Sequence, residues 1–385
     1  MNYLRRTWAE INLDALRHNA LEIRKHTHPH TKLMGVVKAD GYGHGAVAVA
    51  ELLRELGYDM LGVSNINEAL QLRRADIELP ILILGYTPPE AAKQLLDNGL
   101  TQTVYSQGQA LALSQACQAQ QCTLPVHLKI DTGMSRLGFQ HNEIEAILAV
   151  CNLPNLDIQG LFTHFSSGDD KAVTLAQLDR FCGTRKKLRD LGENFYVAHC
   201  ANSAAVLQYP CTHFDMVRPG VILFGQSPVQ QTINGWELQP VMSLHSIVSQ
   251  VKCVAKGEGV SYDRKYVAPS DRLVATVPIG YADGYPRALS CRGSALINGK
   301  VAPLLGAVCM DMTMFDVTDI EDVCEGTEVV LFGKQGDAEL SLSNVAQEVG
   351  TITYEIMCNV GKRVPRVYKQ NGVEVGVTKN FVIDD

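Results

Sequence analysis

The sequence predicts a two-domain α/β protein, with a parallel (β/α)8 barrel followed by a mainly antiparallel β domain. Three observations carry this prediction. The chain has 385 residues, which exceeds the usual size of a single core. Its first two thirds alternate short β-branched runs with helical patterns, and its last third is rich in β-runs and turns. We therefore expect a barrel over residues 1–235 and a β domain over residues 236–385, with the first few residues packing on the latter.

Eight short apolar runs predict the barrel strands. They lie at 33–38, 61–64, 81–84, 102–105, 126–130, 158–163, 196–198 and 216–218. Helical patterns separate them at 46–57, 68–75, 89–99, 107–120, 142–151 and 174–192, and a further one at 13–25 precedes the first strand. Eight strands joined by helical crossovers favour a closed TIM-type barrel, with an open doubly wound sheet as the alternative.

The pattern of predicted elements changes near residue 239, from alternating strands and helices to mostly strands. Strand-like runs follow at 242–254, 272–277, 294–297, 312–317 and 328–332, with one late helical pattern at 343–360. Turn dipeptides such as Asn298-Gly299 separate some of these runs, as expected of hairpins. This pattern predicts an antiparallel β domain, and the Gln- and Pro-containing segment 226–240 is the expected boundary.

Composition excludes several classes of protein. The net charge is −7 and the sequence has no basic block, which argues against a nucleic-acid partner. No apolar run approaches the roughly 20 residues that span a bilayer, and the N-terminus has no signal-peptide core. Eleven cysteines occur without a CxxC pair, which indicates reduced thiols and gives no support to a metal site. We expect a cytoplasmic protein.

The first predicted strand ends in a lysine, Lys38, and a glycine-rich loop follows at once. A lysine at the end of a buried strand must be desolvated or find a partner. Desolvation lowers the pKa of a lysine and frees a nucleophilic amine, which Schiff-base chemistry needs. A lysine that merely caps a strand and reaches solvent is the structural alternative.

Polar residues also follow most of the other predicted strands, at the end where barrel active sites lie. Each has a structural explanation: His164 could pack in the core, Asn202 could cap a helix, and Arg218 could form a structural ion pair. Because they share one rim with Lys38, we interpret them as a site. The set comprises Lys38, Asn65, Tyr105, the loop 131–136, His164, Asn202, Ser203 and Arg218.

Two of these loops suit a phosphate group. Asn202 and Ser203 open a predicted helix, whose N–H groups and dipole favour an anion. Gly220 lets the backbone approach closely, and Gly220 and Val221 can donate N–H groups. These loops follow the last two strands, where barrels often bind phosphate. A lysine facing such a phosphate site predicts pyridoxal 5′-phosphate (PLP) as the cofactor.

The chain resembles the alanine racemase family, the PLP enzymes of barrel type, almost from end to end. The residues that carry this resemblance are VKADGYGHG (37–45), HLKIDTGMSRLG (127–138), THF (163–165), ANSA (201–204), MVRPG (216–220), VSY (260–262), IGYADGY (279–285) and VCMD (308–311). So many matches in the same order make the resemblance highly specific. It implies the interconversion of L- and D-alanine, which supplies D-alanine for peptidoglycan.

The resemblance also implies a role for individual residues. Lys38 would bind PLP covalently and act as base on the D-alanine side, and Tyr262 would act as base on the L-alanine side. An unperturbed tyrosine pKa near 10 requires neighbours that favour the anion, and His164 is the candidate neighbour. Tyr262 lies in the β domain, so it would reach the barrel mouth of a second subunit. The active form would therefore be a homodimer with composite sites.

Further residues receive supporting roles from the same resemblance. Arg218, supported by His199, would face the pyridine nitrogen and leave it unprotonated, since arginine keeps its proton. Lys129 matches a lysine that is carbamylated in many members of the family and that orients Arg136. The phosphate would be held by Tyr42, Ser203, Gly220, Val221 and Tyr354, beside Asn202. The substrate carboxylate or its entrance would be lined by Arg136, Tyr281 and the backbone N–H of Met310.

Three alternatives stay open at this point. A broad-specificity racemase of the same fold would resemble secreted, disulfide-bearing proteins. A barrel-type PLP decarboxylase would pair the pyridine nitrogen with a carboxylate, whereas Arg218 matches an arginine. A non-catalytic PLP-binding protein would resemble the barrel alone.

Overall fold

The computed structural model describes residues 6–229 and 235–378. The described chain forms two units, which we treat separately: residues 6–15, 42–45 and 240–378 make up unit 1, and 16–41, 46–229 and 235–239 make up unit 2. The domain boundary expected between residues 235 and 236 stays a prediction. The residues just before it, 230–234, lie outside the described part of the chain. No helix within the described residues is both long and apolar enough to span a bilayer.

Unit 2 is a near-closed barrel of eight parallel strands. Its strand order is β10-β2-β3-β4-β5-β6-β8-β9, which follows the sequence apart from the closing strand β10. This order rules out the doubly wound sheet, in which the strand order reverses at a switch point. The strands are β2 (Lys32–Val36), β3 (Met60–Val63), β4 (Ile81–Ile83), β5 (Leu100–Val104), β6 (Leu124–Asp131), β8 (Leu156–Phe162), β9 (Val197–His199) and β10 (Met216–Val217), with the short β7 (Phe139–Gln140) beside β6.

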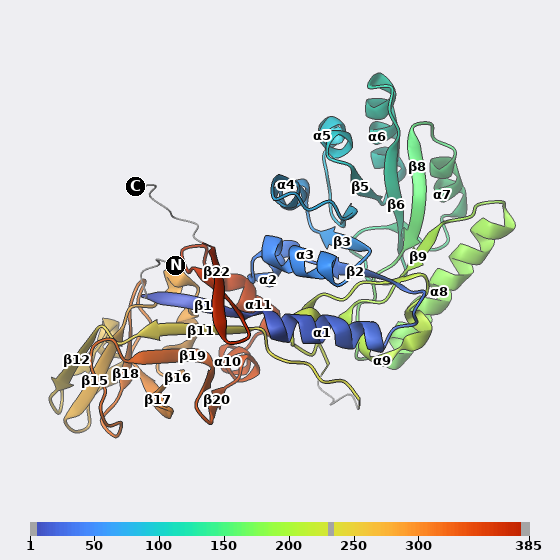
Figure 1. Cartoon of the computed structure of the whole chain (residues 1–385). Coiled ribbons are helices and arrows are strands. Elements are labelled where there is room, and N and C mark those ends of the chain that lie inside the picture. The colour runs from blue at the N-terminus through green and yellow to red at the C-terminus, as the bar shows by residue number, and fades with distance from the viewer. Residues whose placement is uncertain (1–5, 230–234, 379–385) are drawn as a thin grey trace. The chain divides into compact units, whose positions relative to one another are not determined.

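Helices follow these strands in alternation, as Figure 1 shows for α4 to α7 around β3 to β8. Polar residues start several of them: Asn65, Ser106 and Asp170 each accept a backbone N–H of the first turn. The helices are α1 (Leu13–Lys25), α3 (Ala46–Glu55), α4 (Ile66–Arg74), α5 (Ala92–Asp97), α6 (Gln107–Ala119), α7 (Ile144–Cys151), α8 (Lys171–Asp190) and α9 (Ser203–Gln208). All eight predicted strands and all seven predicted helices of this region are confirmed, with ends shifted by a few residues.

The interior of the barrel has an apolar side and a polar side. Met34, Leu82 and Met216 pack together without exposure to solvent. On the other side, alternation along β6 brings His127 and Lys129 to one face of the strand, where both contact other barrel side chains. A buried polar group is costly unless it is hydrogen-bonded, so this polar side marks a functional region.

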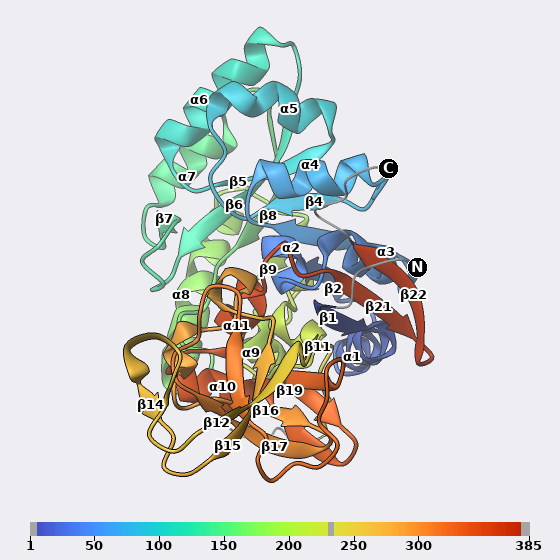
Figure 2. The same ribbon diagram turned by 90° about the vertical axis from the view of Figure 1, so that its left-hand side faces the viewer.

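Unit 1 is built on one mainly antiparallel sheet in the order β12-β15-β18-β17-β16-β19-β11-β1-β21-β22, with β20 beside β19. The neighbouring strands β16, β19 and β11 can be followed in Figure 2. Its strands are β1 (Thr7–Asn12), β11 (Met242–Ile247), β12 (Gln250–Val254), β15 (Arg272–Val277), β16 (Ser294–Ile297), β17 (Lys300–Leu305), β18 (Thr313–Asp316), β19 (Glu328–Gln335), β20 (Ala338–Leu340), β21 (Arg366–Gln370) and β22 (Val373–Thr378), and β13 (Gly259–Val260) pairs separately with β14 (Tyr266–Val267).

The structure differs in three details from the elements expected for this unit. The run 242–254 is two strands, because at Val248 and Ser249 the backbone bonds first to Thr327 and then to Thr276, so the chain changes neighbours. The pattern 343–360 is two helices, α10 (Leu342–Val349) and α11 (Thr353–Asn359), since Gly350 takes a left-handed conformation (φ 82°) that ends the first.

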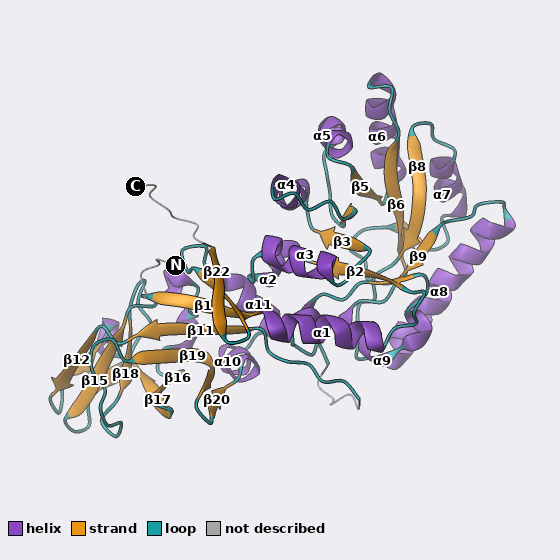
Figure 3. Cartoon of the chain, in the orientation of Figure 1, coloured by secondary structure: helices purple, strands orange, loops and turns teal. Residues whose placement is uncertain are grey.

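The third difference concerns the start of the chain, where no strand is predicted before the helix at 13–25. Residues 7–12 form β1, which pairs antiparallel with β11 and parallel with β21. Thr7 to Ala9 are all buried, so exposed and buried residues do not alternate at the start of this strand. The sequence therefore lacks the alternation of polar and apolar residues that marks a half-buried strand. Figure 3 shows the strand-rich character of this unit in orange.

Candidate active site

The loop that carries Lys38 has an unusual backbone. Strand β2 ends at Val36, so Lys38 lies two residues beyond the strand rather than closing it as predicted. The segment Lys38–Tyr42 (α2) is a left-handed turn, with φ of 52° at Ala39, 54° at Asp40 and 61° at Gly41. Left-handed backbone costs a residue other than glycine roughly 1–2 kcal/mol, and such strain concentrates at functional sites.

Side chains of the surrounding elements hold this strained turn in place. Glu68 on α4 accepts the N–H of Ala39 at 2.8 Å with one oxygen and the N–H of Ser64 at 2.7 Å with the other. Asp40 accepts the N–H of Ala46 at 2.8 Å, which ties the turn to the start of α3. Glu68 therefore positions the Lys38 loop, a role that sequence reasoning missed.

Arg218 lies at the centre of the polar side of the barrel. It is buried, and burial lowers the pKa of its guanidinium to about 10, so it stays charged at neutral pH. Nη1 lies 2.9 Å from His199 Nδ1, and Nη2 donates to the carbonyl oxygens of Thr163 at 2.7 Å and Cys200 at 3.1 Å. The bonds that the guanidinium makes to the described residues all use Nη1 or Nη2. Its Nε–H is therefore available to donate to a bound ligand.

His164 lies beside Arg218, with Nδ1 3.5 Å from Nη2, at the outer limit for a hydrogen bond. Burial, with added repulsion from Arg218 and Arg136, holds the pKa of His164 well below its ordinary value. His164 is therefore neutral at neutral pH. It can donate a hydrogen bond from Nε2, but it does not supply a positive charge.

Lys129 is also buried, above the ring of Phe162 at 5.7 Å from the ring centre. Burial lowers its pKa to about 8, and repulsion from Arg136 and Arg218 acts in the same direction. At pH 7 about one tenth of this amine is therefore unprotonated and nucleophilic. The nitrogen of Lys129 can therefore react as a nucleophile.

Arg136 is carried by a loop that Asp131 holds closed. One carboxylate oxygen of Asp131 accepts three backbone N–H groups, from Gly133 at 2.8 Å, Met134 at 2.9 Å and Ser135 at 3.1 Å. The role of Asp131 is therefore structural, and Arg136 stands exposed at the end of this loop.

The two loops proposed for phosphate are joined to each other. The hydroxyl of Ser203 accepts the N–H of Gly220 at 2.9 Å. Asn202 caps α9 by accepting the N–H of Ala205 at 3.1 Å, and its amide donates to Phe165 at 3.3 Å. Val221 begins a short 3-10 turn directly after Gly220. The N–H of Gly220 is thus bonded to Ser203, while the Ser203 hydroxyl hydrogen and the N–H of Val221 at the ends of β9 and β10 make a donor set that suits a phosphate.

In unit 1 the remaining predicted residues fall into two groups. Tyr42 and Tyr354 lie together, with ring centres 6.0 Å apart, and burial raises the pKa of Tyr354 to about 12. Tyr262 and Met310 line a cavity of about 400 Å³ with Ser261, Cys309 and Met312. Tyr262 is 68% exposed and Met310 53% exposed, unusually high values for such side chains.

Tyr262 lies in a second strained segment. Ser261, Asp263 and Arg264 around it all have positive φ, of 67°, 59° and 49°. The hydroxyl of Ser261 fixes the turn by donating to the carbonyl of Ala307 at 2.7 Å. Residues with positive φ therefore flank both Lys38 and Tyr262, the two residues predicted to move protons.

Tyr281 and Met310 are held side by side through their backbones. The N–H of Tyr281 bonds to Cys309 O at 3.0 Å, and that of Ala282 bonds to Met310 O at 3.0 Å. The loops approach so closely at Gly280 that a Cβ there would lie 2.3 Å from both Cys309 O and Met310 O. Only glycine fits at this position.

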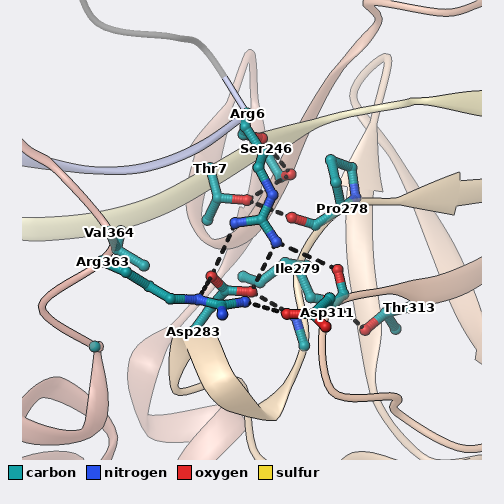
Figure 4. A network of polar contacts seen from close by, with 12 residues as sticks. Arg6, Thr7, Ser246, Pro278, Ile279, Asp283, Asp311, Thr313, Arg363 and Val364 are labelled. Carbon is teal, nitrogen blue, oxygen red and sulfur yellow. Dashed lines mark hydrogen bonds and ion pairs between the residues drawn. The ribbon is translucent and has the colours of Figure 1, made fainter. Parts of the chain in front are cut away.

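An ion-pair network centred on the buried Asp283 fixes these two loops (Figure 4). Asp283, fully buried, pairs with Arg6 at 3.0 Å and Arg363 at 2.7 Å, and it accepts the N–H of Gly280 at 2.9 Å. Arg363 also pairs with Asp311 at 2.5 Å. Burial raises the pKa of Asp283, but the hydrogen bonds from Arg363 and Arg6 outweigh it, and the net pKa lies below the ordinary value. Sequence analysis does not predict this network, because its members are far apart in the chain.

We expect Asp283→Asn to destabilise unit 1 by about 1–3 kcal/mol, because it weakens the hydrogen bonds of a buried carboxylate to two arginines that are themselves partly exposed. A carboxylate with a lowered pKa stabilises the fold above its unfolded pKa, and this contribution is lost as pH falls through the folded pKa. The wild type should therefore lose Tm more steeply than the variant below about pH 4. Asp97→Asn, which breaks only the exposed Lys93–Asp97 pair, is the control and should change Tm little. Equal Tm values for the two variants would contradict the prediction.

Comparison with known proteins agrees with the assembled geometry. Residues 11–228 match the alanine racemase N-terminal domain, and residues 241–368 match the alanine racemase C-terminal domain. The chain belongs to the alanine racemase family. It is 46% identical to the alanine racemase of Desulforamulus reducens over 366 residues, which cover 94% of this chain and 98% of that protein.

Solved structures of the family have the same fold. The alanine racemase of Clostridium difficile 630 matches with a TM-score of 0.95 and 39% identity, over 99% of this chain and 100% of that one. That of Bacillus anthracis with bound L-Ala-P matches with a TM-score of 0.93 and 35% identity, over 98% and 99% of the two chains. The protein is thus a PLP-dependent enzyme that interconverts L- and D-alanine. The match to the C-terminal domain also sets aside a PLP-binding protein made of the barrel alone.

With the cofactor known, the position of Glu68 leads to a prediction. Glu68→Gln keeps one acceptor oxygen and turns an amide N–H toward Ala39 or Ser64, so the strained Lys38 turn loses a bond of about 1–3 kcal/mol. We expect PLP to bind about tenfold more weakly, as measured by titrating cofactor-free protein and following absorbance. Glu51→Gln on the exposed face of α3 is the control, and an unchanged affinity in Glu68→Gln would contradict this role.

Proposed function

We propose that racemisation uses two proton carriers, Lys38 from the barrel and Tyr262 from unit 1. In this scheme one group removes the α-proton from one face of the substrate and the other returns a proton to the opposite face. In the barrel, Arg218 and Arg136 cannot give up protons, and Asp131 is occupied by three backbone N–H groups. Neutral His164 and the partly unprotonated Lys129 have other proposed roles, beside Tyr262 and Arg136. Lys38, which would hold PLP, is therefore the barrel's proposed carrier, and the exposed Tyr262 is the candidate for the second.

The barrel residues fit PLP. Ser203, Gly220 and Val221, with Tyr42 and Tyr354 of unit 1, would hold the phosphate, beside Asn202. Arg218 would donate Nε–H to the pyridine nitrogen and keep it unprotonated. PLP supplies an electron sink that acidifies the α-hydrogen of alanine. Since arginine donates and does not release its proton, this sink is weaker than one with a carboxylate partner, which disfavours decarboxylation and transamination.

The chain's own residues then perform the proton transfers. Lys38 would take or give the α-proton on the D-alanine side, and Tyr262 would do so on the L-alanine side. Neutral His164 would stabilise the Tyr262 anion by donating from Nε2, because its lowered pKa excludes the charged form near neutral pH. Arg136, the backbone N–H of Met310 and Tyr281 would orient the substrate carboxylate.

Lys129 is proposed to carry a carbamate that orients Arg136. Its pKa of about 8 leaves some free amine near neutral pH. A carbamate would place a negative charge beside Arg136 and Arg218, where the protonated amine places a positive one. Protein exposed to ¹³C-labelled bicarbonate should show a carbamate carbon signal that is absent in Lys129→Gln. The amine is protonated below its pKa, so the signal should weaken as pH falls below 8.

The active form is proposed to be a homodimer whose sites combine the barrel of one subunit with the unit 1 cavity of the other. The support is the exposed group of Tyr262, Met310 and Met312 around that cavity, since such a cluster marks an interaction surface. Cytoplasmic action is proposed because no disulfide joins any of the eleven cysteines within the described residues. The D-alanine formed would supply peptidoglycan, so cells lacking the gene should need added D-alanine.

Incubation with L-alanine in deuterated water tests the two-carrier scheme. It should give D-alanine with deuterium at the α-carbon, since the proton taken from one face is replaced from solvent by a group on the other. Release of carbon dioxide would point to decarboxylation instead. Inversion with full retention of the original hydrogen would show a single carrier and refute the scheme.

A further inference from the structure

A chain of hydrogen bonds crosses the polar interior of the barrel from Arg218. Arg218 Nη1 lies 2.9 Å from His199 Nδ1, and His199 Nε2 lies 2.9 Å from His127 Nδ1. Phe162 stacks on His199 at 4.7 Å with an angle of 5° between the rings, which fixes the plane of that imidazole. His127 lies on the polar side of the barrel, but no role in the site has been assigned to it above.

The chemistry of the three groups determines where each proton lies. A guanidinium has donors only, so His199 Nδ1 must be without hydrogen to accept from it. The hydrogen of a neutral His199 then sits on Nε2 and is donated to His127 Nδ1. His127 in turn carries its hydrogen on Nε2. Both rings are buried, and burial lowers the pKa of His127 to about 4 and that of His199 well below its ordinary value, so both are neutral.

His127 also lines a cavity of about 480 Å³ at the N-terminal end of the barrel. Lys32, Met60, Val197 and Met216, the first residues of four strands, form part of its wall. This is the end opposite to the Lys38 loop. The cavity contains enough space for water, which can accept the Nε2–H of His127 where a protein partner would otherwise be needed.

We propose that His127 is a positioning residue that fixes the tautomer of His199 and thereby the orientation of Arg218. If His199 carried its hydrogen on Nδ1, two donors would face each other at Arg218 Nη1 and His199 Nε2 would lose its hydrogen. Without the acceptor on His127, the Nε2–H of His199 would be a buried donor without a partner, and the alternative tautomer would gain population. This inference rests on the proposed contact of Arg218 with the pyridine nitrogen.

Three substitutions separate the acceptor from the ring. His127→Phe keeps a ring but has no acceptor, whereas His127→Asn places its amide oxygen near the position of Nδ1. His127→Gln carries its amide near the position of Nε2 instead, so it should behave like the phenylalanine variant. His30→Phe, at an exposed histidine, is the control.

The first measurement is ¹⁵N NMR of histidine-labelled protein, both cofactor-free and loaded with PLP, with signals assigned by substitution. We expect His199 in the wild type and in His127→Asn to carry hydrogen on Nε2 alone. His127→Phe and His127→Gln should show a mixture of tautomers. Hydrogen on Nδ1 in the wild type, or an unchanged His199 in both of the latter variants, would overturn the inference, whatever the role of Arg218.

The second measurement is steady-state kinetics on folded, PLP-loaded protein, with folding checked by Tm. We expect kcat to fall about tenfold in His127→Phe and His127→Gln with the KM for alanine little changed, and to stay within about twofold in His127→Asn. A mixture of tautomers with unchanged kcat would support the hydrogen-bond chain but overturn the proposed role of Arg218. An equal loss of kcat in His127→Asn would overturn the role of the acceptor atom.

Discussion

Lys38→Ala is expected to abolish racemisation, with kcat/KM lower by about four orders of magnitude or more. The variant loses both the amine that holds PLP covalently and a proton carrier, and a single carrier contributes about 10²–10⁴-fold. The visible absorbance of lysine-bound PLP should disappear as well. Activity and spectrum can be followed on the same sample.

Lys32→Ala is the matched control for this experiment. Lys32 begins strand β2 and is exposed, whereas Lys38 follows the other end of the same strand and is half-buried. The control should keep its spectrum and its activity. If Lys38→Ala retained substantial racemisation, both the cofactor attachment and the first proton carrier would be wrongly assigned.

Tyr262→Phe is expected to act on one enantiomer. It removes the hydroxyl that would accept the α-proton of L-alanine, so exchange of that hydrogen with deuterated water should fall about 10²–10⁴-fold. D-Alanine should still exchange its α-hydrogen through Lys38, without inversion. PLP binding should be nearly unchanged. Tyr266→Phe, four residues further along, is the control, and equal exchange of both enantiomers in Tyr262→Phe would refute the second carrier.

Mixing the two inactive variants tests whether the site is shared between subunits. If Lys38 of one subunit works with Tyr262 of the other, half of the randomly formed dimers are mixed and each has one intact site. Activity should then return to about one quarter of the wild-type value. If both residues act within one subunit, no dimer contains an intact site and the mixture stays inactive.

Much of the fold could be predicted from the sequence because its signals are local. The period of apolar residues distinguishes strand from helix, and residues such as Asn65 start helices through bonds within one turn. The barrel order follows from regular alternation, since consecutive parallel strands joined by helices lie side by side. Strand β1 was not predicted, because its first three residues are all buried and show no alternation, and its pairing partners β11 and β21 lie more than 200 residues away.

The site residues that belong to local motifs could also be predicted from the sequence. The residues that hold them in position could not. Lys38, Arg218 and Ser203 stand at strand or helix ends that the sequence marks. His127 opens the motif at 127–138 and shares a strand face with Lys129, but neither signal shows what its side chain contacts. The contact with His199, 72 residues later, is visible only in the folded barrel.

The sequence by itself determined the family, the chemistry of the donor set and the order of the strands, because each depends on residue identity and local spacing. Tertiary structure decided which groups are charged and where their protons lie. His164 is neutral, Lys129 is partly unprotonated, and His199 presents a bare nitrogen to Arg218. These properties come from burial and from neighbours brought together by folding, and no stretch of sequence contains them.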